Sequence, residues 1–231
     1  MKITVVGASG LIGTKVVDLL TAEGHDVVAA SRGSGVDVLT GDGLADALSG
    51  ADALVDVLNS PSFDDDPVME FFTTSATNLV AAAKAAGVGH YVALSIVGVD
   101  GLPDSGYMRA KVVQEKIITE SGLPYTIVRA TQFAEFTDAI TDSMTTGDEV
   151  RVPDALIQPV AADDVARDVA RAAVAQPLGG VVNIGGPQKI SFEQMARDVV
   201  SRRGDDKTVV VDPQARYFGT RLDERSLVTP D

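Results

Sequence analysis

A tyrosine and a lysine four residues apart, Tyr107 and Lys111, lie in a segment whose pattern predicts a helix over 105–121. Residues four apart share one helix face, and Ser95 ends the strand predicted before that helix. A phenol can donate a proton to an oxygen that gains negative charge, and a nearby ammonium lowers the phenol's pKa from about 10. A serine hydroxyl can polarise a carbonyl. These three are therefore candidate catalytic residues; the alternative is an exposed tyrosine, a solvated lysine and a strand-capping serine.

The chain begins with an apolar strand that enters a turn rich in glycine and continues as an amphipathic helix. Such a turn, here called the glycine turn (residues 7–13), aims free backbone N–H groups at one point, which suits the pyrophosphate of a dinucleotide. Gly7 allows the tight turn, Gly10 lets the backbone approach phosphate, and Gly13 lets the helix pack closely. The expected phosphate-binding residues are Gly7, Ser9, Gly10, Leu11, Ile12 and Gly13. The alternative is a helix N-terminus with incidental glycines, which the strand–turn–helix context disfavours.

The end of the second predicted strand indicates which dinucleotide is preferred. A protein that selects NAD often places an acidic residue there to bind the ribose 2′-hydroxyl, whereas this chain has Ser31 and Arg32. An arginine can pair with a 2′-phosphate, which favours NADP(H) over NAD(H); the alternative is a solvated surface arginine. Asp37 is a rival ribose partner, but two glycines separate it from the strand. Asp42 is a candidate for the adenine side or a plain helix cap.

Three residues after the third predicted strand are expected to pass beneath the cofactor: Leu58, Asn59 and Ser60. Lys111 is also expected to hold the nicotinamide ribose. The substrate side is expected from 59–63, 131–136 and the loop at 154–157, with an apolar wall of Phe133, Phe136, Met144 and Ile157. The alternative is that these four apolar side chains are ordinary core residues.

Short β-branched runs alternate with helical segments over the first 130 residues, which predicts βαβ units and a mostly parallel, doubly wound sheet of the Rossmann type. Beyond strand 1, the expected strands are 27–30, 53–58, 90–95 and 125–129, and the expected helices are 42–48, 67–86 and 105–121. Later helices are expected at 133–145, 162–175 and 191–203, and later strands at 149–152, 156–160, 181–184 and 208–211. We interpret residues 1–231 as one α/β domain in which 131–212 contribute a small lobe over the carboxyl edge of the sheet.

The composition excludes several classes of function. The net charge of −14 disfavours nucleic acid and anionic membranes as partners, and a chain without cysteine has neither disulfides nor thiolate metal sites. His25 and His90 stand alone, and the run 64–66 of three aspartates is more typical of a helix start than of a metal site. No apolar run reaches transmembrane length, so a cytoplasmic protein with a small-molecule substrate is expected.

The segments Gly7-Ala-Ser-Gly10-Leu-Ile-Gly13 and Tyr107-Met-Arg-Ala-Lys111, together with Ser95, resemble the short-chain dehydrogenase/reductase superfamily. Segments 122–129, 159–166 and 183–187 make the chain more similar to its atypical, NmrA-like and quinone-reductase-like branch. The resemblance implies a Rossmann fold, NADP(H) and a Ser–Tyr–Lys site in which Tyr107 is the acid/base. Two departures are Ala130, where extended members often have proline, and a C-terminal region that is short for a nucleotide-sugar enzyme.

Two functions remain open at this point. The first is an NADPH-dependent reductase of a small carbonyl or quinone-like compound, with Tyr107 as the proton donor. The second is a redox sensor that binds NADP(H) and acts through a protein partner, because many NmrA-like relatives lack the tyrosine and only sense cofactor. A homodimer through the helices 67–86 and 105–121 would be family-like.

Overall fold

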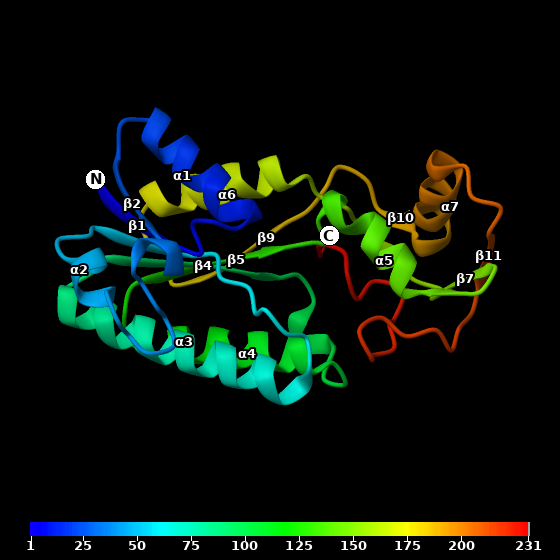
Figure 1. Cartoon of the computed structure of the whole chain (residues 1–231), viewed down its shortest axis with the longest axis horizontal. Helices are drawn as coiled ribbons and strands as arrows, with labels where there is room; N and C mark the ends of the chain where they lie inside the picture. Colours follow the sequence, from blue (N-terminus) through cyan, green and yellow to red (C-terminus); the bar gives the residue numbers. More distant parts are fainter. Residues whose placement is uncertain (231) are drawn as a thin grey trace.

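A six-stranded, fully parallel sheet forms the centre of the computed structural model, which describes residues 1–230 (Figure 1). In spatial order its strands are β2 (Asp26–Ala30), β1 (Lys2–Val6), β3 (Ala53–Asp56), β4 (His90–Ile96), β5 (Tyr125–Ala130) and β9 (Gly180–Ile184). The chain moves outward from β1 to β2 and then crosses back to β3. The carboxyl ends of β1 and β3 therefore flank the switch point at which open α/β sheets bind ligands.

Helices cover both faces of this sheet, as the doubly wound prediction requires. On one face α1 (Leu11–Ala22) packs against α6 (Ala162–Val174), and on the other α3 (Asp65–Ala86) packs against α4 (Gly106–Thr119), with the short α2 (Leu44–Leu48) beside α3 (Figure 1). Each face has its own apolar core beneath its helices. Local signals set the helix ends: Ser105 caps α4 through the N–H of Met108, and Gly87 ends α3 with a φ of 71°. The predicted α/β fold is confirmed.

A smaller lobe lies beyond the carboxyl ends of the central strands (Figure 1). Its members are α5 (Thr137–Ser143), β6 (Thr145–Thr146), β7 (Glu149–Val152), β8 (Leu156–Ile157), β10 (Ile190–Ser191), α7 (Phe192–Arg203) and β11 (Thr208–Val211). β7 pairs with β6 and β11, and β8 pairs with β10. Phe192 and Ile157 are fully buried in a core that the lobe shares with Val99, Leu102 and Met108 of the central layer, so the lobe packs directly against α4.

Two elements from the second half of the chain belong to the central layer rather than to this lobe. The helix α6 packs on α1, and β9 extends the central sheet beside β5. Conversely, the tail after β11 belongs to the small lobe: Tyr217 and Leu227 are buried in its core, and the N–H of Thr229 donates to Gln158 Oε1 at 2.9 Å. The lobe therefore excludes α6 and β9, which lie within the expected 131–212, and extends past residue 212.

Several element boundaries also differ from the expected ones. The third strand ends at Asp56, the strand expected over 156–160 ends at Ile157, and the helix expected over 133–145 starts with a 3-10 turn, Ala134–Phe136. Among residues 1–230, no helix is long and apolar enough to cross a membrane.

Candidate functional site

The glycine turn has the close approaches that a phosphate cradle needs. Gly7 has a φ of +80°, and a Cβ on it would lie 2.9 Å from the carbonyl oxygen of Val57. A Cβ on Gly13 would lie only 2.1 Å from the carbonyl oxygen of Gly7, so α1 can pack here only through glycine. Ser9, Gly10 and Leu11 are exposed, while Ile12 is buried in the core. The turn thus leaves the amino end of α1 open to an anion, and its residues fit a dinucleotide pyrophosphate.

Arg32 lies at the end of β2 in a short 3-10 turn, Arg32–Ser34. The backbone N–H of Ser31 donates to Ser34 Oγ at 2.9 Å, which fixes this turn. The Arg32 side chain is exposed and has no ion pair or hydrogen bond with residues 1–230. Its guanidinium is therefore available to an anion at the position where the ribose of a dinucleotide is expected.

The other residues expected near the cofactor have different surroundings. Asp42 does not cap α2, because that helix starts at Leu44 after Gly43; its carboxylate accepts from the Thr40 hydroxyl at 2.9 Å instead. Leu58 donates its N–H to Asp56 at 3.1 Å, and Ser60 is buried. The cofactor roles of Asp42, Leu58 and Ser60 stay predictions.

Tyr107 reaches from α4 to the loop after β3. Its phenol donates to Asn59 Oδ1 at 2.8 Å, and its ring packs against Phe63 and Phe72 at centroid distances of 5.3 and 5.9 Å. Burial of this phenol raises its pKa well above the ordinary value of 10. The expected lowering of this pKa by Lys111 is therefore not found, and Tyr107 holds its proton throughout the neutral range.

Lys111 lies deeper than Tyr107, with a side chain only 3% exposed. Its ammonium donates to the Leu94 carbonyl at 2.9 Å and to Gln114, and it sits 4.6 Å from the centre of the Phe72 ring. Burial lowers the pKa of Lys111 from 10.5 to about 8, although the charges of Asp56 and Glu115 oppose the shift. The Lys111 ammonium is thus held between α4 and β4. This position explains why it does not lower the pKa of the Tyr107 phenol.

A buried carboxylate that sequence reasoning missed organises this region. Asp56 is fully buried at the end of β3 and accepts from the Tyr91 hydroxyl and from Gln114 Nε2, each at 2.9 Å. Gln114 then accepts from Lys111, so the network joins β3, β4 and α4. An aspartate within the otherwise apolar run 53–58 was the signal that could have revealed it.

Ser95 is only 4% exposed near the end of β4, and its Oγ has no hydrogen-bond partner among residues 1–230. A buried hydroxyl without a partner is costly and needs an explanation. At the carboxyl end of a central strand, a substrate oxygen is a suitable partner, as expected for a group that polarises a carbonyl. The catalytic roles of Ser95, Tyr107 and Lys111 therefore stay predictions, but Lys111 does not lower the pKa of Tyr107 as expected.

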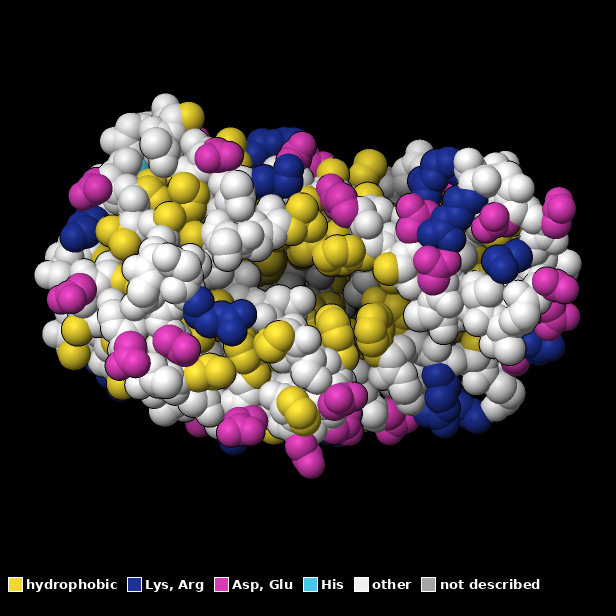
Figure 2. Space-filling model, viewed as in Figure 1, with side chains coloured by type: hydrophobic (Ala, Val, Ile, Leu, Met, Phe, Trp, Pro, Cys, Tyr) yellow, Lys and Arg dark blue, Asp and Glu magenta, His cyan; other side chains and the backbone are white. Residues whose placement is uncertain are grey.

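Several aromatic side chains lie in or beside the segments from which the substrate side is expected. Phe63 and Phe218 are 53% and 46% exposed and lie 5.9 Å apart, and the half-exposed Phe136 stacks on Phe133 at 5.6 Å. Figure 2 shows a hollow between the two lobes that is rimmed by hydrophobic side chains. Two members of the expected apolar wall are core residues instead, since Met144 and Ile157 are buried inside the small lobe. Phe218, which comes from the tail, takes part in the wall but was not predicted.

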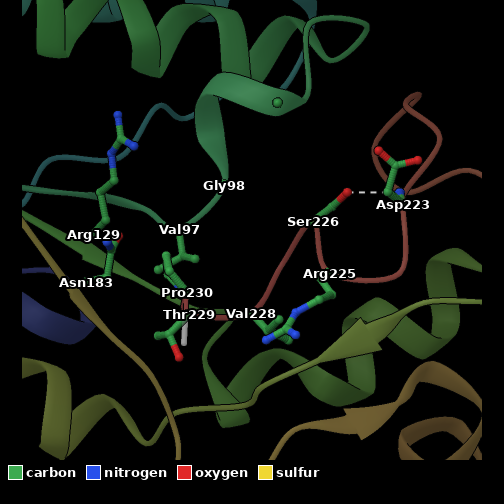
Figure 3. A pocket seen from close by; sticks show the side chains of 11 residues that line it. Val97, Gly98, Arg129, Asn183, Asp223, Arg225, Ser226, Val228, Thr229 and Pro230 are labelled. Atoms are coloured by element: carbon green, nitrogen blue, oxygen red, sulfur yellow. Dashed lines mark hydrogen bonds between the residues drawn. The ribbon is translucent and has the colours of Figure 1, made fainter.

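A separate cavity of about 470 Å³ lies where the tail crosses the ends of β4, β5 and β9 (Figure 3). Arg129 and Asn183 line it opposite Ser226 and Thr229. The Arg129 guanidinium is already paired with Asp100 at 2.6 Å and with the buried Glu115 at 2.5 Å. Because none of the expected cofactor residues lines this cavity, it is distinct from the candidate site.

The fold and the glycine turn define a Rossmann-type dinucleotide-binding protein, and comparison with known proteins identifies its family. The model of a family described as NAD(P)H-binding matches residues 7–177. A (4-alkanoyl-5-oxo-2,5-dihydrofuran-3-yl)methyl phosphate reductase from Streptomyces griseus is 32% identical over 212 residues, covering 83% of this chain and 70% of the reductase. The chain therefore belongs to this NAD(P)H-binding oxidoreductase family of the NmrA-like, atypical dehydrogenase class, which confirms the predicted resemblance.

Other relatives differ in what they do. Photosystem II assembly factor Ycf39 from Cyanophora paradoxa is 29% identical over 147 residues, which cover 58% of this chain and 46% of Ycf39. The chain thus spans about half the length of this relative. Among solved structures, a dTDP-4-dehydrorhamnose reductase from Clostridium acetobutylicum has a TM-score of 0.75 at 20% identity, covering 98% of this chain and 91% of its own. An NADPH-dependent quinone oxidoreductase from Escherichia coli has a TM-score of 0.66 at 22% identity, covering 90% and 77%. These two structures share the fold.

Proposed function

We propose that the protein is an NADPH-dependent reductase of a small carbonyl or quinone-like compound. The observation that carries this proposal is the hydrogen bond from Tyr107 to Asn59. The loop containing Asn59 begins at Val57, whose carbonyl closely approaches Gly7 of the glycine turn. The phenol is thereby brought to the edge of the sheet where the nicotinamide of a dinucleotide bound on that turn is expected.

The glycine turn would hold the pyrophosphate and Arg32 the 2′-phosphate, and bound NADPH supplies the hydride. The chain's own contribution is the proton. Tyr107 carries its proton at neutral pH, as a phenol with an ordinary or raised pKa does, and can transfer it from Oη to the oxygen of a carbonyl as that oxygen gains charge.

The other two candidate residues have supporting roles in this proposal. Ser95 donates its unpartnered hydroxyl to the same substrate oxygen and orients it. Lys111 stabilises the fold and does not tune the acidity of the Tyr107 phenol, because its hydrogen bond to the Leu94 carbonyl holds α4 against β4. The exposed rings of Phe63 and Phe218 offer flat apolar surfaces, which suit a substrate containing a ring.

Replacement of Tyr107 by phenylalanine tests this proposal. Tyr107→Phe should retain NADPH affinity within about twofold and reduce the turnover of ketones by roughly 100-fold or more. Quinones, which accept hydride with less help from an acid, should show a smaller loss. Tyr125→Phe on β5 is the matched control and should leave turnover intact. Undiminished ketone reduction by Tyr107→Phe, or no turnover of any carbonyl by the wild-type protein, contradicts the proposal.

A second candidate function is a redox sensor, which the Ycf39 relatives and the inward position of Lys111 favour. A sensor should bind NADPH and NADP⁺ with different affinities but reduce nothing in a broad panel of carbonyls and quinones. It should also change its association with itself or with a partner when the cofactor changes oxidation state. Light scattering with each cofactor, combined with the turnover panel, distinguishes the two functions.

A further inference from the structure

A buried glutamine beside the candidate site has no place in the reductase chemistry described so far. Gln132 follows β5, is only 8% exposed, and its Oε1 has no hydrogen-bond partner among residues 1–230. Its backbone is fixed, because its carbonyl accepts from the N–H of Val160 at 2.9 Å. An unsatisfied buried amide oxygen costs free energy comparable to a lost hydrogen bond, so a partner from outside the chain is a physical explanation for it.

The tail covers the Gln132 side chain. Tyr217 is only 4% exposed, its ring meets Phe218 at 4.7 Å and Phe192 at 5.8 Å, and its phenol lies beside the Gln132 side chain. The amide oxygen of Gln132 is the atom that stays buried without a hydrogen-bond partner among residues 1–230.

The same cluster connects Gln132 to Tyr107. Ring contacts run from Tyr217 through Phe218 and Phe63 to Tyr107. Phe218 takes a φ of +45°, which is unfavourable for a phenylalanine and places its ring over this region. Two unpartnered buried oxygens thus lie at one edge of the sheet, that of Ser95 near the end of β4 and that of Gln132 just after the neighbouring β5.

These two oxygens have complementary requirements. The Ser95 hydroxyl can donate to a carbonyl, whereas an amide oxygen can only accept. We infer that Gln132 is a substrate-binding residue that accepts a hydrogen bond from an O–H or N–H group of the substrate. Resting on the proposed reductase function, this inference narrows the substrate to a ring-containing carbonyl compound that carries a hydrogen-bond donor apart from the carbonyl to be reduced.

Binding of matched probes tests the inference without requiring turnover. The probes are 3- and 4-hydroxyacetophenone and their methyl counterparts, 3- and 4-methylacetophenone, in which a methyl group replaces the hydroxyl at nearly the same size. Calorimetry is performed on the NADP⁺-loaded protein. At least one hydroxyl probe should bind the wild-type protein roughly three- to tenfold more tightly than its methyl counterpart, as expected for one hydrogen bond.

Gln132→Leu should abolish that preference for the hydroxyl, and Gln132→Met should do the same if the leucine variant does not fold. The exposed Gln176→Leu is the matched control and should keep the preference. No hydroxyl preference in the wild-type protein, or an equal preference in the wild-type protein and a folded Gln132 variant, overturns the inference. A preference that depends on Gln132 in a protein that reduces no carbonyl upholds the binding role and refutes the reductase function instead.

Discussion

The low pKa of Lys111 predicts that the free energy of unfolding depends on pH in an unusual direction. Lys111 has a pKa of about 8 in the folded protein, against 10.5 for an unperturbed lysine. Between these two values the unfolded chain binds more protons than the folded one, so stability increases as pH rises through this window. A shift of this size corresponds to about 3 kcal/mol in total, most of which falls between pH 7 and pH 10.

The test compares the wild-type protein with Lys111→Met, which has a similar side-chain length and no charge. Urea unfolding is followed by circular dichroism at pH 7, 8, 9 and 10, without cofactor. Tyrosine ionisation affects both proteins alike and cancels in the difference, and the loss of the hydrogen bonds to Leu94 and Gln114 gives an offset that does not depend on pH. The wild-type protein should therefore gain about 2 to 3 kcal/mol relative to the variant between pH 7 and pH 10.

The exposed Lys84 on α3 offers the control. Lys84→Met should differ from the wild-type protein by an amount that stays constant with pH. If the difference between wild-type and Lys111→Met also stays constant within about 0.5 kcal/mol, the ammonium is not desolvated as the structure indicates. The explanation of why Lys111 fails to act on Tyr107 would then be wrong.

Two further predictions concern the cofactor site. Arg32→Ala should weaken NADPH binding by roughly 10- to 100-fold and NADH binding by less than twofold, because only NADPH has the 2′-phosphate. Fluorescence titration with each cofactor measures these affinities, and Arg197→Ala in the small lobe is the control. Equal losses for NADPH and NADH would show that Arg32 does not bind the phosphate. Gly13→Ala should lower the free energy of unfolding by about 2 kcal/mol and weaken both cofactors, since its Cβ would lie 2.1 Å from the Gly7 carbonyl oxygen. Gly101→Ala, where a Cβ meets nothing within 4 Å, should leave both unchanged, and a Gly13→Ala variant as stable as wild type would contradict the packing argument.

The central sheet and the glycine turn could be predicted from the sequence because their signals are local. Each strand is a short apolar run, each long helix repeats its apolar residues, and the glycines lie between the first strand and the first helix. The positions of α6 and β9 in the central layer could not be predicted, for a reason that is equally physical. An amphipathic helix shows which of its faces is buried but not which layer buries it, so only the contact with α1 decides the placement.

The tail shows the same limit at the site itself. Tyr217 and Phe218 lie in a segment without periodicity, about 110 residues from the Tyr107 that they approach. Their position depends on the burial of Leu227 and on the hydrogen bonds from Thr229 to Gln158, which are contacts between distant parts of the chain. No local pattern could therefore have assigned these two rings to the substrate side.

The spacing of Tyr107 and Lys111 correctly indicated a shared helix face but not where each side chain ends. Lys111 lies one helical turn beyond Tyr107, and its ammonium donates hydrogen bonds to the Leu94 carbonyl and to Gln114 in the interior. Gln114 is held in turn by Asp56, the last residue of β3, so the same carboxylate that fixes the lysine network also fixes the start of the loop that presents Asn59. The position of the Tyr107 phenol thus depends on a buried polar network as much as on the Tyr-x-x-x-Lys motif. A substitution at Asp56 should therefore shift the Tyr107 phenol through Asn59, although Asp56 and Tyr107 share no hydrogen bond.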